Sequence, residues 1–140
     1  MKRLLAWLKR PAKDVDSGMW GEREAERHLR AKGYHILGRR VRIGDRDELD
    51  LVAEDGKAVV FVEVKTRKTE DYGRPAESVK RDKRHTMSRA AGRYLKHLRR
   101  RPRYIRFDVV EVVGGPCEGV RDMRHIENAF QLDRPYELPY

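Results

Sequence analysis

The segment Glu48–Arg67, ELDLVAEDGKAVVFVEVKTR, most strongly limits what this chain can fold into. Two apolar segments rich in β-forming residues, Leu49–Ala53 and Ala58–Val64, lie on either side of the pair Asp55-Gly56. An Asp-Gly pair between two such segments is a strong signal for a β-hairpin. We therefore expect a hairpin with Asp55 and Gly56 as its two turn residues.

This turn fixes which residues face one another across the hairpin. Asp50 is expected to face Phe61, and Glu48 is expected to face Glu63. Because side chains alternate across a strand, one face should carry Glu48, Asp50, Glu63 and Lys65, and the other Leu49, Leu51, Val60, Val62 and Val64. Asp50 and Glu63 would then be diagonal neighbours, roughly 7–8 Å apart at the backbone and within reach of one shared ion.

The charges at the end of the apolar run VVFVEVK need compensation, because a carboxylate near a β core costs free energy. A hard cation can provide it: Mg²⁺ takes oxygen ligands and typically uses one or two carboxylates together with phosphate oxygens. Asp50 and Glu63 fit this requirement, and the Val64 carbonyl could add a ligand. Lys65 could orient or deprotonate a water and stabilise charge in the transition state. The pattern therefore favours metal-activated water attacking a phosphodiester, although a lone ExK motif is also typical of a solvated strand end.

Positive charge is concentrated in one part of the chain. The formal net charge is +10, from 33 Lys and Arg against 23 Asp and Glu. Twelve of the basic residues and one acid, Asp82, lie between Lys80 and Arg106, so the rest of the chain is close to neutral. Such a patch attracts polyanions, with nucleic acid first and an anionic membrane surface second. Contacts to nucleic acid are expected from Lys83, Arg84, Arg89, Arg93, Lys96 and Arg67.

Cysteine usage and hydropathy exclude several other classes of protein. Cys117 is the only cysteine, so an intrachain disulfide and a Cys-based zinc site are excluded and a reducing compartment is allowed. The apolar run at residues 4–8 is too short for a signal sequence or a membrane span. We therefore expect a cytoplasmic protein without a membrane partner.

The chain is long enough for one domain with a core and too short to expect two. Residues 1–16 are expected to form a basic flexible arm, although a short amphipathic anchor is the alternative. Residues 17–130 should form the folded domain and residues 131–140 a C-terminal tail. The expected fold class is α/β, with a mixed β-sheet of about four or five strands flanked by helices.

Two helices are predicted, one on each side of the hairpin in sequence. The first runs from Ser17 to a terminating Gly33, with Gly21, Ala25 and Leu29 on its buried face. The second begins near Lys80 and is bounded by Pro102; its apolar face is Met87, Ala90, Ala91, Tyr94, Leu95 and Leu98. It forms a crossover between the third and fourth strands, which should therefore be parallel neighbours. After the fourth strand we expect a ragged addition with one short apolar-polar run, residues 123–130.

Glu22 and Glu26 lie one turn apart beside the buried face of the first helix. The simpler interpretation is a solvated pair with salt bridges to nearby arginines of the same helix, Arg23, Arg27 or Arg30. A functional role for Glu22 requires this helix to dock beside Asp50.

Several separate segments, in order, resemble one known family: GEREAERHLRAKGYHIL, ELDLVAED, VVFVEVKTR, GRPAESV, the helix containing Lys83, RFDVVEV and IENAF. Over Gly18 to Phe130 the chain looks like the YraN-like family. The domain of that family resembles the PD-(D/E)xK restriction-endonuclease-like fold and, within it, the archaeal Holliday-junction resolvases.

The resemblance implies a role for each residue of the motif. Glu22 would be the helix glutamate, Asp50 the first metal aspartate, Glu63 the second acid and Lys65 the catalytic lysine, with Glu22, Asp50 and Glu63 binding Mg²⁺ or Mn²⁺. The chain departs from the pattern at two positions. Leu49 replaces the proline of the motif, and Asp47 replaces the glycine that usually precedes the glutamate.

The leading hypothesis is a metal-dependent endonuclease of the PD-(D/E)xK type that cleaves DNA in preference to RNA, with branched DNA as a candidate substrate. A homodimer is expected by analogy with junction resolvases. Two alternatives stay open. One is a catalytically inactive nucleic-acid-binding module of nuclease ancestry, and the other is an adaptor whose basic helix binds an acidic protein partner.

Overall fold

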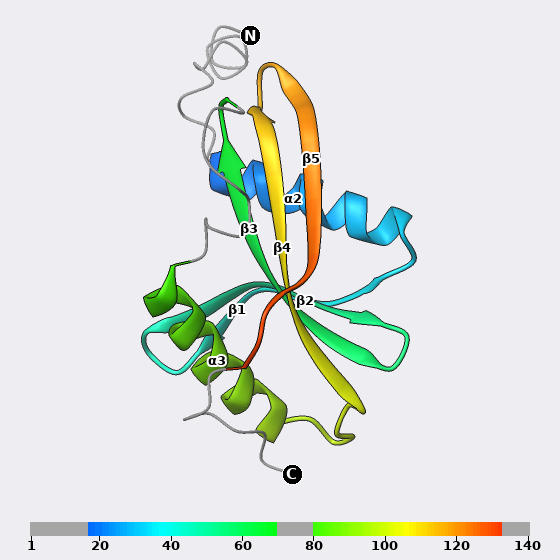
Figure 1. The fold of residues 1–140 in the computed structure, drawn as a ribbon, viewed down its shortest axis with the longest axis vertical. Helices are drawn as coiled ribbons and strands as arrows, with labels where there is room; N and C mark the ends of the chain where they lie inside the picture. Colours follow the sequence, from blue (N-terminus) through cyan, green and yellow to red (C-terminus); the bar gives the residue numbers. More distant parts are fainter. Residues whose placement is uncertain (1–16, 70–79, 133–140) are drawn as a thin grey trace, which may run out of the picture.

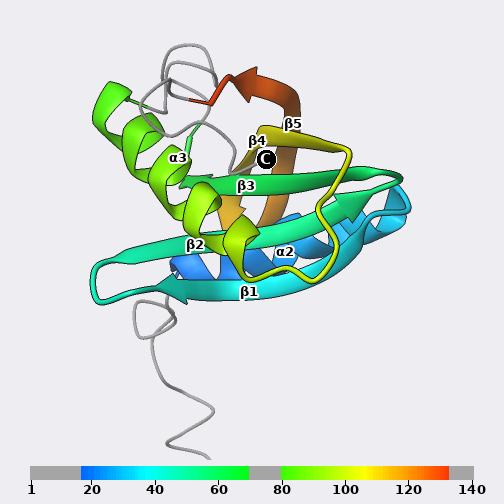
Figure 2. The ribbon, with the colours of Figure 1, turned by 90° about the horizontal axis from the view of Figure 1, so that it is seen from below.

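A computed structural model describes residues 17–69 and 80–132, which form a mixed α/β domain. A single five-stranded sheet carries one helix on each face (Figures 1 and 2). The predicted arm at residues 1–16, most of the loop between the third strand and the second helix, and the tail beyond residue 132 lie outside the described residues. The elements are α2 (Ser17–Ala31), β1 (His35–Ile43), β2 (Asp47–Asp55), β3 (Ala58–Arg67), α3 (Arg81–Lys96), β4 (Tyr104–Gly115) and β5 (Gly119–Phe130).

The strand order is β1-β2-β3-β4-β5, and each strand pairs with its neighbours in the chain. Three of the four pairings are antiparallel, whereas β3 and β4, which are joined through α3, are parallel. The parallel crossover is therefore confirmed. The run at residues 123–130 is more than an addition, because it belongs to a full fifth strand that pairs along β4.

The second helix is shorter than predicted. It ends at Lys96, with His97 as its C-cap, instead of continuing to Pro102. If the helix continued, Lys96 would lie one turn before Arg99 and Arg100 with no intervening acid, and like charges one turn apart destabilise a helix. A residue that precedes proline also disfavours helical backbone. The predicted apolar face still packs on the sheet, with Met87, Ala90, Ala91 and Leu95 buried and Tyr94 and Leu98 partly buried.

The hairpin is present, but its predicted register is wrong. Asp55 pairs with Ala58, so the turn residues are Gly56 and Lys57, and Gly56 adopts the left-handed backbone with φ +59°. The register therefore differs from the prediction by two residues. Continued one pair beyond Leu51–Val62, it places Asp50 opposite Glu63 instead of diagonal to it.

β2 and β3 separate after the Leu51–Val62 pair, and we call this point the fork. From here β2 continues beside β1 alone, and β3 continues beside β4 alone. Figure 1 shows the separation: β1 and β2 run toward α3, whereas β3, β4 and β5 run past α2. Asp50 and Glu63 are the first residues beyond the last pair of the hairpin, one on each strand.

The sheet has one hydrophobic core under each helix. The core under α3 includes Leu49, Val52, Phe61, Phe107 and Val109, together with residues of the helix. The core under α2 is lined by Ala25, Leu29, Tyr34, Leu51, Ala53, Val60, Val62, Val110 and Val112. Leu49 and Leu51 thus lie on opposite faces, which contradicts the predicted common face. The alternation of side chains along β2 is broken at Asp50.

The first helix ends as predicted. Gly33 has φ +94°; its N–H donates to Arg30 O, and the N–H of Tyr34 donates to Leu29 O. This pair of bonds is a Schellman motif, and Tyr34 packs in the same core as Leu29. Gly21, Ala25 and Leu29 are buried on the sheet, as expected. In the described part of the chain, no helix is long and apolar enough to cross a membrane.

Gly21 allows α2 to approach β3 closely. A Cβ at this position would collide with Oγ1 of Thr66. We expect Gly21→Ala to lower the free energy of unfolding by about 1–3 kcal/mol, because the helix or the strand must shift. Urea denaturation measures the change. Gly92→Ala in α3 is the matched control, since a Cβ there has no neighbour within 4 Å; it should stabilise by about 0.5–1 kcal/mol through helix propensity. Destabilisation of similar size in both variants would contradict the packing argument.

Candidate active site

Asp50 fills the space that opens between the strands at the fork. Its Oδ2 accepts a hydrogen bond of 2.9 Å from the backbone N–H of Val64. This side-chain bond links β2 to β3 beyond the point where their backbone pairing ends. Burial raises the pKa of Asp50 to about 7, and a hydrogen bond to the Glu63 carboxyl and the charge of that carboxyl act in the same direction. The two acids therefore share one site, as the sequence predicts, although through a different register.

Glu63 lies on the other side of the fork, and its side chain is only 5 % exposed. Its Oε2 is buried and has no hydrogen-bond partner among the described residues, but it lies 3.4 Å from Nζ of Lys83. Lys83 belongs to the first turn of α3. The start of the basic helix is thus placed over the acidic pair.

Lys65 lies two residues beyond Glu63, half-buried, and pairs in the sheet with Glu111 of β4. Glu111 is fully buried, and within residues 17–69 and 80–132 neither of its carboxylate oxygens has a hydrogen-bond partner. Sequence reasoning overlooked this residue. The signal was available, since Glu111 interrupts an apolar strand just as Glu63 does, and an uncompensated buried carboxylate is costly.

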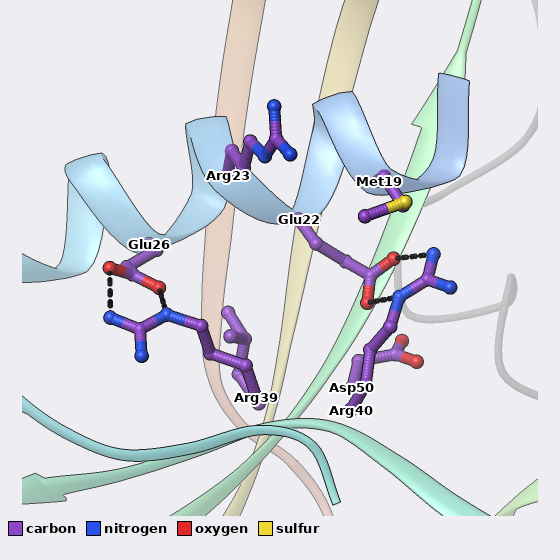
Figure 3. Close-up of a pocket in the computed structure, with 8 residues that line it drawn as sticks. Met19, Glu22, Arg23, Glu26, Arg39, Arg40 and Asp50 are labelled. Carbon is purple, nitrogen blue, oxygen red and sulfur yellow. Dashed lines mark hydrogen bonds and ion pairs between the residues drawn. The ribbon is translucent and has the colours of Figure 1, made fainter. Parts of the chain in front are cut away.

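Glu22 reaches the same region from α2. It lines a cavity of about 200 Å³ together with Asp50, Arg40 and other residues shown in Figure 3. Burial and the charge of Asp50 raise the pKa of Glu22, although Arg40 acts against them. The helix therefore docks beside Asp50, the condition under which a role for Glu22 was expected.

The partners of the two helix acids are mainly arginines of β1. Arg40 donates to both carboxylate oxygens of Glu22 at 3.1 and 2.8 Å. One turn further along α2, Arg39 donates in the same two-pronged way to Glu26, which also accepts from Arg30. The expected salt bridge within the helix is thus found at Glu26, whereas Glu22 is bound by Arg40 of β1.

The donor set partly fits a divalent cation. Burial and the neighbouring Glu63 carboxyl disfavour ionisation of Asp50, which is the situation that a hard cation relieves. In the arrangement described, however, no group of three or more Asp, Glu, His or Cys side chains of residues 17–69 and 80–132 could hold a metal. Glu22 faces Arg40 instead. Ligation of a metal by all three acids therefore stays a prediction.

The residues expected to contact nucleic acid lie in different environments. Arg89 is engaged by Asp47, with bonds of 2.8 and 2.7 Å that lower the pKa of this buried acid. Asp47 is the residue that departs from the family pattern, and the structure gives it a partner in α3. Lys83 is drawn to Glu63. Of the other residues expected to contact nucleic acid, Arg84, Arg93 and Lys96 are exposed on α3, and Arg67 is half-buried at the end of β3.

The raised pKa of Asp50 has a consequence for stability. A carboxyl whose pKa is higher in the folded state than in the unfolded state destabilises the fold as pH rises from the unfolded to the folded pKa, which for Asp50 is from about 4 to about 7. Asp50→Asn removes this penalty and keeps an acceptor for Val64 N–H. We expect the metal-free variant to be more stable than the wild type by about 1–3 kcal/mol at pH 8, and equally stable near pH 4.

Chemical denaturation in EDTA at the two pH values measures the difference. Asp45→Asn is the control, because Asp45 is exposed in the β1–β2 turn and should give no pH-dependent gain. A variant that is less stable than the wild type at pH 8 would show that ionised Asp50 supports the fold.

A mixed five-stranded sheet with a helix on each face, and an acidic pair where two strands separate, defines an α/β protein of restriction-endonuclease-like fold. Residues 21–112 match the model of the "Uncharacterised protein family UPF0102", and the chain belongs to this family. The resemblance to the YraN-like family is thereby confirmed.

Three relatives are similar to the chain over nearly their whole length. A UPF0102 protein of Symbiobacterium thermophilum is 47 % identical over 113 residues, which cover 81 % of this chain and 94 % of the relative. A UPF0102 protein of Chlorobaculum tepidum is 43 % identical over 119 residues, covering 82 % and 92 %. One of Syntrophomonas wolfei is 44 % identical over 115 residues, covering 81 % and 96 %.

Proposed function

We propose that this protein is a nucleic-acid-binding, divalent-metal-dependent endonuclease that hydrolyses phosphodiester bonds of DNA, with branched DNA as the substrate class to test first. The observation that carries the proposal is the convergence of Asp50 and Glu63 at the fork, under a lysine at the start of a basic helix. A carboxyl such as Asp50, whose pKa is raised by burial and by a neighbouring acid, is typical of functional sites.

Each residue has a defined part in this reaction. Asp50 and Glu63 would hold Mg²⁺ or Mn²⁺, with Glu22 as a third acid within reach. The cation would supply activation of a water and neutralisation of phosphate charge. Lys65 stabilises negative charge that develops on the phosphoryl oxygens and orients the attacking water. Lys83, Arg84, Arg93 and Lys96 bind the backbone phosphates of the substrate.

The direct test is a cleavage screen of the wild-type protein. Junction, flap, linear duplex and single-stranded DNA, with matched RNA, are incubated with Mg²⁺, Mn²⁺, Ca²⁺ or EDTA. We expect cleavage with Mg²⁺ or Mn²⁺ and none in EDTA, with DNA preferred to RNA. Sedimentation of the free protein and of its DNA complex tests the expected homodimer. Absence of cleavage on every substrate with every ion would overturn the proposal.

Two observations favour a second candidate function. Glu22 is held by Arg40, and the described residues contain no ready group of three metal-binding side chains. A module that binds nucleic acid without cutting it would retain this arrangement. Calorimetric titration with Mn²⁺ separates the two functions, because an inactive module with a structural Glu–Lys cluster should take up no metal.

A further inference from the structure

The backbone of Arg40 is unusual. Its φ is +43°, a left-handed conformation that costs free energy for a residue other than glycine or asparagine. Its neighbours Arg39 and Val41 pair with Leu51 and Leu49 of β2, so Arg40 lies opposite Asp50. The strained residue of β1 and the acid at the fork are therefore at the same level of the sheet.

This conformation changes where the side chains of β1 point. Arg39 and Arg40 both reach α2, whereas Val41 packs against the core under α3. In a regular strand, two consecutive residues would point to opposite faces. The left-handed turn at Arg40 thus brings a second arginine to the α2 side of the sheet, next to Asp50, as Figure 3 shows. Strain of this kind is often found at functional sites.

The Glu22–Arg40 ion pair is built so that Arg40 meets solvent first. The Arg40 side chain is 42 % exposed, whereas that of Glu22 is 14 % exposed. An anion that approaches the cavity therefore meets the guanidinium before the carboxylate. A guanidinium presents the same planar pair of donors to a phosphate as to a carboxylate, and partly exposed ion pairs are weak. Exchange of one anion for the other is therefore energetically accessible.

We propose that Arg40 is a phosphate-binding residue of this site, and that the backbone phosphate of a nucleic acid displaces Glu22 from it. Glu22, once released, is free to join Asp50 in the cavity that both residues line. This inference rests on the proposed function. It accounts for a third acid that lies beside Asp50 and is nevertheless bound to an arginine. The Glu26–Arg39 pair lines the same cavity one turn further along α2, but Arg39 pairs with Leu51 and not with Asp50, and it takes no part in the exchange.

The matched variants are Arg40→Asn and Arg39→Asn. Asparagine tolerates left-handed backbone, so Arg40→Asn removes the guanidinium while the strand keeps its course. DNA binding is measured in EDTA over a range of salt concentrations, where cleavage plays no part. We expect Arg40→Asn to weaken binding about 3–10-fold and to reduce the salt slope by about 1, and Arg39→Asn to change affinity less than about 2-fold. Equal losses in both variants, or no loss in either, would overturn the assignment.

Calorimetric titration with Mn²⁺, without DNA, tests the release of Glu22. Arg40→Asn should bind Mn²⁺ about 3–10-fold more tightly than the wild type, and adding Glu22→Gln should reverse the gain, whereas Glu22→Gln alone should have little effect. An effect of Glu22→Gln that is the same in both backgrounds would show that no exchange takes place.

The outcome also separates this inference from the proposed function. If the wild type binds Mn²⁺ and DNA without cutting, and the variants behave as expected, the nuclease proposal fails and the role of Arg40 stands. If the wild type cleaves DNA and Arg40→Asn binds DNA as tightly as the wild type, the role of Arg40 fails alone.

Discussion

Asp50→Ala is expected to reduce metal-dependent DNA cleavage by about 10³-fold or more, since Asp50 is the acid that lies next to both Glu63 and Glu22. Its Oδ2 also accepts the Val64 N–H, and its charge acts on Glu22. Single-turnover cleavage of a labelled junction, with Mg²⁺ and with Mn²⁺, measures the loss. DNA binding in EDTA should stay within about 2-fold of the wild type, because Asp50 contributes no positive charge to phosphate binding.

Lys65→Ala should have a comparable effect for a different reason. Lys65 and Glu63 are two residues apart on β3 and therefore lie on the same face of the strand. The ammonium would stabilise charge only in the transition state, so the rate should fall while substrate affinity changes little. Lys57→Ala is the matched control, since it removes a lysine of the same hairpin that is exposed in the turn. Cleavage that survives in both Asp50→Ala and Lys65→Ala, or that falls as strongly in Lys57→Ala, would remove these residues from the proposed mechanism.

The hairpin shows what local pattern could and could not predict. The two apolar segments and the left-handed glycine follow from the sequence, because β-forming side chains and an Asp-Gly pair act over a few residues. The choice of turn residues does not, since Asp55-Gly56 and Gly56-Lys57 both place a glycine in the turn. The shift of two residues preserves the parity of the pairing, which is why Asp50 and Glu63 still meet.

The fork itself could not be predicted from alternation. Leu49 and Leu51 would share a face in a regular strand, and they do not: β2 parts from β3 at Asp50 and continues beside β1 alone. At the same level of the sheet, Arg40 of β1 adopts left-handed backbone, although the adjacent Arg39 and Val41 are not turn-forming residues. The position of Arg40 beside Asp50 therefore became visible only in three dimensions, whereas Glu111 left a signal in the sequence as an acid within an apolar strand.

A second buried polar network lies on the α2 side of β4, and Asp108 is at its centre. This fully buried carboxylate accepts hydrogen bonds from Arg106 Nε and Nη2, from His125 Nε2 and from the backbone N–H of Asn128. The bonds are between 2.7 and 3.0 Å long. Although burial acts to raise it, the bonds from His125 and Arg106 lower the pKa of Asp108. The carboxylate thus holds two cationic or polar side chains inside the fold.

Asp108→Ala is expected to lower the free energy of unfolding by about 3–5 kcal/mol at neutral pH, because it leaves Arg106 and His125 with buried donors that lack their acceptor. A carboxyl with a lowered pKa in the folded state stabilises above its unfolded pKa and loses this effect as pH falls through the folded value. The difference between variant and wild type should therefore shrink below about pH 4. Guanidinium denaturation between pH 3 and 7 measures it. Asp122→Ala removes a partly exposed ion pair with Arg124 on β5 and should cost less than about 1 kcal/mol. Asp108→Ala could instead lower the free energy of unfolding no more than Asp122→Ala, or by an amount that does not depend on pH. Either result would show that packing around β4, and not the charge of Asp108, holds Arg106 and His125 in place.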